Sequence, residues 1–479
     1  MSVSVAVSEY PLVVDLDGTL IQSDILVESF FELLSSRPLR ALASLRSLGE
    51  GRAAFKARLA NEVTLDLSTL PFNEELLAFL RAEKARGRRV YLASAAHESC
   101  VKEIAARLGL FDGVFASDGK NNLKGKAKAD ALCAAFGHGG FDYAGNDQID
   151  LAVWSEARGA IAVNASAKLI WAVRQRFGDV VIISPRRADF AEYGRALRLH
   201  QWLKNLLVFV PAFTAHHFEG TTILACCIAF LSFSLCASSV YLVNDLLDLR
   251  SDRDHPTKRH RPLAAGRLGV FNGIILVPTT AAAAVMLALL LPWQFFGTLA
   301  VYCTLTLSYS LYIKRKIMLD VVALACLYGM RLWAGAAAVS VPLSPWLLSF
   351  ALFLFLSLAL VKRWTELSDR AETGKGDPVG RGYRVSDLPV IQAMATASGY
   401  IAVMIFGLYI NSTTVVQLYA RPGYLWAIPV ILLYWISRIL LLTHRGEMHD
   451  DPVLFAATDR TSLLCAGLIG LVVGVSGMQ

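Results

Sequence analysis

The sequence predicts two domains of different class: an open α/β domain, followed by an all-α polytopic membrane bundle. The chain has 479 residues, more than one ordinary domain needs, and 55% of them are hydrophobic while only 18% are charged. Charges are dense up to about Phe190, whereas beyond His200 apolar runs of membrane-spanning length recur. We therefore expect a soluble domain at 1–180, a linker and interfacial segment at 181–198, and a membrane domain at 199–479.

Composition narrows the cellular setting. The N-terminus, M-S-V-S-V-A-V-S-E-Y, has no basic region followed by a long apolar core, so we expect no cleaved signal peptide and a cytosolic soluble domain. The eight cysteines form no metal-ligand or disulfide spacing, which indicates reduced packing residues. The net charge of +7 is concentrated in short connections of the membrane half, which favours a membrane surface and anionic substrates over nucleic acid.

Three apolar segments of the soluble half are typical of buried strands that end in polar side chains. Leu12–Asp15 runs into D-L-D-G-T-L, Arg89–Ala93 ends in Ser94, and Tyr143–Gly145 ends in N-D-Q-I-D. Helical segments lie between them, so we expect a Rossmann-like α/β sheet whose polar groups meet at the strand ends. Val180–Ser184 is a candidate for one more strand.

An insert from Asp24 to about Phe72 interrupts this pattern. Apolar residues recur at helical spacing in Leu26–Leu34 and Leu39–Leu48, which predicts a small helical cap over the strand ends. Such a cap would limit substrates to small phosphorylated molecules.

The linker is marked by composition. Pro185-Arg186-Arg187 begins it, and a basic amphipathic segment, Tyr193–His200, leads to the membrane.

The D-L-D-G-T-L hexapeptide is a specific signal, and on it the soluble half resembles the haloacid-dehalogenase superfamily of phosphohydrolases over about residues 9–175. The resemblance implies that Asp15 is the nucleophile that takes up a phosphoryl group and that Asp17 is the general acid/base. It also implies a Mg²⁺ site in which Asp147 or Asp150 joins Asp15 and Asp17.

The same resemblance assigns the phosphate-binding groups. Ser94 would bind a phosphate oxygen, and Lys128 would pair with the phosphoryl charge, with Lys124 as the other candidate. One departure concerns the last motif, where an acid usually follows the glycine but Asn146 follows Gly145 here. Asparagine brings no charge to a metal site, so the alternative of an inactive scaffold domain stays open.

Apolar runs in the second half predict nine membrane spans. They lie at 200–216, 222–243, 268–290, 293–312, 318–340, 344–361, 388–411, 424–443 and 461–478. Under strict alternation the basic connections fall on one side, and the opposite connections contain only Arg421. We expect a multi-pass protein of a bacterial-type plasma membrane, with the basic connections and the soluble domain in the cytosol.

The connection after the span at 222–243 reads N-D-L-L-D-L-R-S-D-R-D-H-P-T-K-R-H-R-P-L-A-A-G, residues 244–266. Four amide or carboxylate residues recur at intervals of three and four, so they share a face if the preceding helix continues: Asn244, Asp245, Asp248 and Asp252. Prolines then stop the helix, and three bases follow: Lys258, Arg259 and Arg261. Carboxylates for a divalent cation beside bases for phosphate are what a magnesium-diphosphate site needs. The alternative is a solvated helix end with positive-inside charge.

Other polar residues of the membrane half lie near the same predicted face. They are Lys204 and Asn205 in H-Q-W-L-K-N, Lys314 in the basic run Y-S-L-Y-I-K-R-K, the intramembrane charges Asp320 and Arg331, and Lys362, Arg363, Glu366 and Asp369 after the sixth span. Lys204 could bind substrate or anchor the chain at the interface. Asp369 and Asp451 read as solvated charge.

The N-D-x-x-D-x-x-x-D motif is the specific signal of this half, which resembles the UbiA superfamily of intramembrane transferases over 195–479. Within it the chain is most similar to the phosphoribosyl-transferring branch, the decaprenyl-phosphate phosphoribosyltransferases. That likeness rests on H-Q-W-L-K-N, H-P-T-K-R-H-R-P and K-R-W-T-E-L. A second acid motif of the form D-x-x-x-D, typical of members that use isoprenoid diphosphates, is replaced by Lys362-Arg363 with Glu366.

The resemblance implies a transferase with Mg²⁺ in both domains, phosphoribosyl pyrophosphate as donor and a polyprenyl phosphate lipid as acceptor. The diphosphate would be held on Mg²⁺ by the four acid-motif residues, with Asp245, Asp248 and Asp252 catalytic, and the lipid head would lie near Lys204 or Arg331. The fused phosphohydrolase could then remove the 5-phosphate. Two alternatives remain: prenylation of an aromatic acceptor by a prenyl diphosphate, and a membrane carrier or scaffold. Self-association is left open.

Overall fold

The computed structural model describes residues 9–63, 66–118, 121–183, 190–255, 257–374, 376–378, 381–448 and 451–477. They form two compact units. One joins Met1–Leu197 to Leu242–Val277, and the other joins Arg198–Tyr241 to Pro278–Gln479. The sequence-based division at 180 and 198 stays a prediction, and Pro185-Arg186-Arg187 lies outside the described residues.

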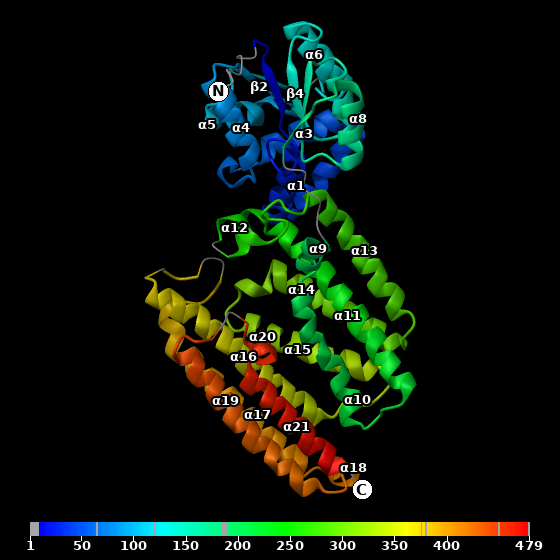
Figure 1. The fold of residues 1–479 in the computed structure, drawn as a ribbon. Coiled ribbons are helices and arrows are strands. Elements are labelled where there is room, and N and C mark those ends of the chain that lie inside the picture. Colours follow the sequence, from blue (N-terminus) through cyan, green and yellow to red (C-terminus); the bar gives the residue numbers. More distant parts are fainter. Residues whose placement is uncertain are drawn as a thin grey trace, which may run out of the picture. The chain divides into compact units, whose positions relative to one another are not determined.

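A six-stranded parallel sheet forms the centre of the first unit, in the order β3-β2-β1-β4-β5-β6 (Figure 1). The strands are β1 (Leu12–Asp15), β2 (Val90–His97), β3 (Gly113–Ser117), β4 (Asp142–Gly145), β5 (Gly159–Val163) and β6 (Val181–Ile183). Val13 is in register with Tyr91 of β2 and with Tyr143 of β4, so β1 is a central strand. The open α/β prediction is confirmed, including β6.

Two strands, β3 and β5, were not predicted. Their sequences, G-V-F-A-S and G-A-I-A-V, are five residues each, and neither leads into a motif that the sequence analysis singled out. Short apolar runs of this kind cannot be assigned by periodicity alone.

Helices cover both faces of the sheet. Leu12 and Val14 pack with α4 (Glu74–Ala85) and α5 (Glu98–Leu108) on one face. On the other face Val13 packs in a cluster with three further helices: α6 (Lys126–Phe136), α7 (Leu151–Trp154) and α8 (Ala167–Phe177). Because successive side chains of β1 point to opposite faces, its fully buried residues join two separate cores.

The insert after β1 forms the predicted helical cap. It consists of α1 (Ile25–Ser36), α2 (Pro38–Ser44), η1 (Leu45–Glu50), α3 (Arg52–Glu62) and η2 (Leu67–Thr69). Leu33, Ala41, Phe55 and Leu59 form a small core of their own inside it. Asp24 begins α1, because its side chain accepts hydrogen bonds from the backbone N–H groups of Leu26 and Val27.

The remaining part of the first unit is α9 (Phe190–Ala196) together with the segment that carries the acid motif. That segment holds the end of α11 (Gly220–Leu247), α12 (Leu249–Asp254), η5 (Lys258–His260) and the start of α13 (Val270–Ala288). Leu246, Leu249 and Leu263 are buried in one cluster against Val27 and Phe31 of the cap.

The second unit is helical. Its elements are η4 (Leu199–Phe209), α10 (Val210–Thr214), α14 (Trp293–Leu311), η6 (Ile313–Arg315), α15 (Leu319–Ala338), α16 (Pro345–Glu372), η7 (Val385–Asp387), α17 (Leu388–Ile410), α18 (Thr413–Leu418), η8 (Pro422–Trp426), α19 (Ala427–His444), α20 (Pro452–Thr458) and α21 (Arg460–Gly477), with the rest of α11 and α13. Within it α16 packs on α17, α17 on α19, and α19 on α21 (Figure 1).

Among the described residues seven helices are long and apolar enough to cross a membrane, against nine predicted spans. The run at 293–312 is the helix α14, but Gln, Thr and Ser side chains make it less apolar than the seven. The run at 200–216 is no continuous helix: it is the 3₁₀ helix η4 followed by the five-residue α10, in which Pro211 lies near the start. Proline has no N–H to donate to a preceding turn, which favours a break there.

Candidate functional sites

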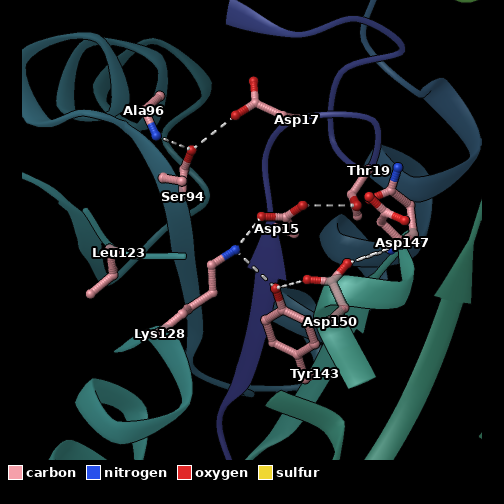
Figure 2. Close-up of polar contacts among 12 residues, drawn as sticks. Asp15, Asp17, Thr19, Ser94, Ala96, Leu123, Lys128, Tyr143, Asp147 and Asp150 are labelled. Atoms are coloured by element: carbon pink, nitrogen blue, oxygen red, sulfur yellow. Dashed lines mark hydrogen bonds and ion pairs between the residues drawn. The ribbon is translucent and has the colours of Figure 1, made fainter. Parts of the chain in front are cut away.

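The carboxyl end of β1 carries the first site (Figure 2). Asp15 Oδ1 lies 2.6 Å from Nζ of Lys128, which reaches it from α6. The same ammonium group donates to the hydroxyl of Tyr143 at 3.1 Å, and this hydroxyl donates to Asp150 Oδ1 at 2.9 Å. Four residues from four elements, β1, α6, β4 and η3 (Gln148–Asp150), thus form one buried polar network. Tyr143 was missed as a site residue because the sequence places it inside an apolar strand.

Of the two candidate lysines, the geometry selects Lys128. It is 4% exposed and paired with Asp15, whereas Lys124 is exposed on the loop before α6. Of the two candidate acids, Asp150 is the buried one, and its Oδ2 accepts from the backbone N–H groups of Asn146 and Asp147. Asp147 is exposed. All four line one cavity, so each stays within reach of a ligand.

Asp17 and Ser94 form a second pair at this end of the sheet. The Ser94 hydroxyl donates to Asp17 Oδ2 at 3.3 Å and accepts from the backbone N–H of Ala96 at 2.9 Å (Figure 2). Ser94 is fully buried, and the cavity is lined by the residues after it rather than by Ser94 itself. Ser94 thus contacts Asp17 in the structure, and its predicted contact with a phosphate oxygen stays a prediction.

The turn after β1 requires glycine at position 18. Gly18 has a positive φ of 75°, and a Cβ atom there would lie 2.1 Å from Nδ2 of Asn146. The Asn146 side chain, which replaces the expected acid, thus lies directly against the turn between Asp17 and Thr19. Any larger residue at position 18 would clash and be strained.

A cavity of about 450 Å³ lies over these residues. The cap contributes Lys56 of α3, whose Nζ donates to the backbone carbonyl of Ala95 at 2.7 Å. Lys56 is the single lysine of the insert from Asp24 to Phe72, but nothing in the local sequence indicates that it reaches the strand ends, so the sequence did not identify it. The cavity is of a size that suits a small phosphorylated molecule.

The residues at this site fit a divalent cation. Burial, and next the neighbouring Asp150, raises the pKa of Asp15 to about 6 against the pull of Lys128. Burial, and next Asp24 and Asp15, raises the pKa of Asp17 to about 7. Carboxylates that are this costly to ionise side by side are favoured partners for a hard cation such as Mg²⁺.

These pKa shifts predict that, without Mg²⁺, the stability of the N-terminal sheet decreases as pH rises. Because the folded-state pKa values lie above the ordinary 3.8, the native state binds more protons than the unfolded one between about pH 4 and pH 7. In EDTA, stability should therefore fall as pH rises through this window. Hydrogen exchange of the β1 peptide in the full chain measures it. Mg²⁺ should protect this peptide far more at pH 8 than at pH 5, and equal protection at both would contradict the expectation.

The acid motif forms the second site of the first unit. The α11 helix ends at Leu247, but i to i−4 hydrogen bonds continue from Asp248 to Asn244 and from Asp252 to Asp248, so the predicted shared face is kept. Arg261 returns to this face: its Nη1 lies 3.0 Å from Asp245 Oδ1 and 2.6 Å from Asp252 Oδ2. The carboxylates of Asp245 and Asp252 are almost fully buried.

Asp252 of the acid motif is costly to ionise even with Arg261 beside it. Burial raises the pKa of Asp252 to about 6, and Asp245 adds to the rise, although Arg261 and Lys258 oppose it. A divalent cation would relieve this, so the donor set fits Mg²⁺. Of the other predicted bases, Lys258 is partly buried in η5, and Arg259 is exposed and donates to the ring of His260 at 3.4 Å.

Within the second unit, Lys204 and Lys362 meet at an acid that the sequence did not single out. Lys204 of η4 forms an ion pair with Asp451, just before α20. Burial raises the pKa of Asp451, but Lys204 and then Lys362 outweigh it and hold the pKa below its ordinary value. Asp451 was read as solvated charge, and only the packing of distant segments places it between two lysines.

Asn205 and Arg331 form a neighbouring pair. Arg331 Nε donates to Asn205 Oδ1 at 2.9 Å, and Asn205 Nδ2 donates to Ser234 at 2.9 Å. The guanidinium also lies over the rings of Phe233, Tyr302 and Tyr328. Arg331 is 4% exposed, so its charge is offset by an amide and aromatic faces.

Of the predicted substrate ligands, Arg363 pairs with both Asp320 and Glu366. Arg363 Nε lies 2.8 Å from Asp320 Oδ2, and its Nη1 is paired with Glu366. Tyr383 donates to Asp320 Oδ1 at 2.5 Å. Because Arg363 and Asp320 are 1% and 0% exposed, this geometry indicates a structural ion pair. Lys314, in η6, is partly buried.

Fold and sites together define a multi-pass membrane protein with a soluble N-terminal α/β domain. Residues 206–458 match the sequence pattern of the UbiA prenyltransferase family, and residues 12–145 match that of the haloacid dehalogenase-like hydrolases. The chain belongs to the UbiA prenyltransferase family and carries a fused haloacid dehalogenase-like hydrolase domain at its N-terminus.

Relatives share different parts of this chain. The uncharacterized protein y4nM of Sinorhizobium fredii is 38% identical over 96% of this chain and 89% of its own length. Nodulation protein NoeC of Azorhizobium caulinodans is 35% identical over 60% of this chain and 94% of its own length. The decaprenyl-phosphate phosphoribosyltransferase of Mycolicibacterium smegmatis is 35% identical over 38% of this chain and 58% of its own length.

Proposed function

We propose that the membrane domain transfers phosphoribose from phosphoribosyl pyrophosphate to a polyprenyl phosphate at the cytosolic face of a bacterial plasma membrane. The observation that carries the proposal is the approach of Arg261 to Asp245 and Asp252, which joins a metal-type carboxylate pair to a base-rich loop. Carboxylates alone would suit any diphosphate donor. The loop bases favour a donor with a further phosphate, and the partial likeness to a phosphoribosyltransferase supports this choice.

The chain's own residues then have distinct tasks. Asn244, Asp245, Asp248 and Asp252 would hold Mg²⁺, which when bound neutralises the diphosphate and stabilises it as a leaving group. Lys258, Arg259 and Arg261 would bind the 5-phosphate. Lys204 and Lys362 would bind the lipid phosphate, since both already share an acid partner. The C1–O bond to pyrophosphate breaks as the lipid phosphate oxygen bonds to C1, and that oxygen is already ionised, so no general base is needed.

We further propose that the N-terminal domain removes the 5-phosphate from the lipid product. The fusion in one chain supports this, as does the buried network of Asp15 and Lys128, which suits phosphoryl transfer. Asp15 would attack phosphorus, and Asp17 would protonate the departing ribose hydroxyl and later deprotonate water.

Asp248→Ala is expected to lower the rate of phosphoribosyl transfer about 10³-fold, because it removes a carboxylate from the metal-binding face. The measurement is incorporation of labelled phosphoribosyl pyrophosphate into extractable lipid, with membranes, polyprenyl phosphate and Mg²⁺. Asp254→Ala is the control, since Asp254 is an exposed acid at the end of α12, the short helix that begins just after Asp248. Failure of the wild type to label lipid, with activity instead on a prenyl diphosphate and an aromatic acid, would overturn the proposal.

A further inference from the structure

The cavity above Asp15 has a wall that the α/β domain does not supply. Its lining includes Gly269, Val270 and Phe271. The last two are the first residues of α13, one of the seven candidate membrane spans. The end of a membrane span lies at the bilayer surface, where head groups and apolar chains meet. The cavity therefore borders a surface from which a lipid could enter.

A buried ion pair holds this wall in place. Arg253 of α12 donates to both oxygens of Glu28 in the cap helix α1, at 3.0 and 2.7 Å. The side chains are only 7% and 6% exposed, and the Arg253 Nε also donates to the carbonyl of Ala264 at 3.1 Å. A bidentate guanidinium–carboxylate pair fixes orientation as well as distance. Ser23 also donates to Glu28, so the pair reaches the loop that follows Asp17.

Close packing adds to this attachment. Gly266 has a positive φ of 66°, and a Cβ atom there would lie 2.8 Å from the side chain of Gln22. Arg250 of α12 pairs with Glu32 of α1 at 3.1 Å. The segment that leads into α13 is thus fastened to the cap by charge, by apolar contact and by a backbone approach that excludes any side chain at position 266.

The lining of the cavity combines two kinds of chemistry. Asp15, Asp17 and Lys128 suit a phosphate group. Apolar side chains of the cap and of α13 also line it, among them Leu26 and Phe271, and Phe271 is 67% exposed. A charged site whose lining includes an exposed aromatic ring is suited to an amphiphilic ligand.

We propose that this site takes phosphate monoesters carried by a membrane lipid, and that Phe271 is the specificity-determining residue that contacts the apolar part of the substrate. In the reaction the ester P–O bond breaks, the lipid-borne hydroxyl leaves with a proton, and water supplies the new oxygen of the released phosphate. The inference rests on the proposed phosphohydrolase activity of the Asp15 site, and it is independent of the proposed phosphoribosyl transfer.

The test compares two substrates on the full chain in nanodiscs: a polyprenyl-linked ribose 5-phosphate and free ribose 5-phosphate. In Phe271→Ala we expect kcat/KM for the lipid-linked ester to fall about tenfold, and that for the free ester to stay within about twofold. Leu289→Ala is the matched control, because Leu289 follows the same helix, is 65% exposed and does not line the cavity. It should leave both values unchanged.

An unchanged ratio of the two values in Phe271→Ala would overturn the inference while leaving the phosphohydrolase function intact. A second measurement tests the case in which the site binds the lipid but does not hydrolyse it. Binding of a radiolabelled, non-hydrolysable polyprenyl-linked phosphonate is measured with and without an excess of soluble phosphonate. Binding that is weakened by Phe271→Ala, in a chain that hydrolyses neither ester, would support the lipid site and overturn the proposed hydrolysis.

Discussion

Asp15→Asn is expected to lower phosphate release by about 10³-fold or more and to leave lipid labelling by the membrane domain intact. The amide keeps the size of the side chain but cannot attack phosphorus, and Lys128 loses its ion-pair partner at 2.6 Å. With both substrates supplied, the variant should therefore accumulate the lipid that still carries its 5-phosphate. Thin-layer separation of labelled lipid before and after treatment with an added phosphatase measures this.

Asp130→Asn is the control for Asp15→Asn. Asp130 lies on the exposed face of α6, the helix that also provides Lys128, and it does not line the cavity. Its replacement should leave both steps unchanged. Wild-type phosphate release in Asp15→Asn would contradict the assignment of the nucleophile. An equal loss of lipid labelling would show that the two steps are not separable in this way.

The parts of the first site that the sequence could predict are those defined by contiguous residues. The hexapeptide D-L-D-G-T-L follows a buried strand and contains two acids and Gly18, whose φ is positive. The strand and the turn follow from this local pattern, and the expected roles of the two acids follow from the resemblance that the pattern carries. The resemblance put Lys128 ahead of Lys124, but both lie near a helix start, and only the folded chain shows that Lys128 reaches Asp15. The pairing of Ser94 with Asp17 depends on neighbouring strands in the same way.

In the membrane half, the sequence predicted most of the spans but not which buried charged side chains pair with one another. Hydrophobic length identified most of the helices, since a span needs about 20 apolar residues. Which buried charges pair is decided by segments far apart in the chain, as with Lys204 and Asp451. Arg363 shows the difference most clearly: its place in K-R-W-T-E-L suggested a substrate ligand, yet its partner is Asp320 on another helix.

Breaking the Asp320–Arg363 pair is expected to destabilise the membrane domain by about 3–5 kcal/mol, because the buried Arg363 guanidinium loses one of its two carboxylate partners and keeps the partly exposed Glu366. Asp320→Ala removes the acceptor of both the Arg363 guanidinium and the Tyr383 hydroxyl. Thermal unfolding of the full chain in detergent can be monitored through its aggregation. The midpoint of Asp320→Ala should lie many degrees below that of the wild type. The double variant Asp320→Ala/Arg363→Met should recover most of the loss, since it also removes the buried guanidinium, and Glu366 keeps Arg381 as a partner at 3.1 Å.

The matched control is a more exposed ion pair of the same unit. Arg438 binds Asp459 at 2.7 and 3.1 Å with side chains 23% and 15% exposed, so Arg438→Ala should cost at most about 1 kcal/mol. A substrate-binding Arg363 would behave differently. Asp320→Ala would then leave unfolding unchanged and raise KM for the donor, and the double variant would lose activity without regaining stability. Because an ion pair that is 0% and 1% exposed has no water to replace a lost partner, we expect the loss of stability instead.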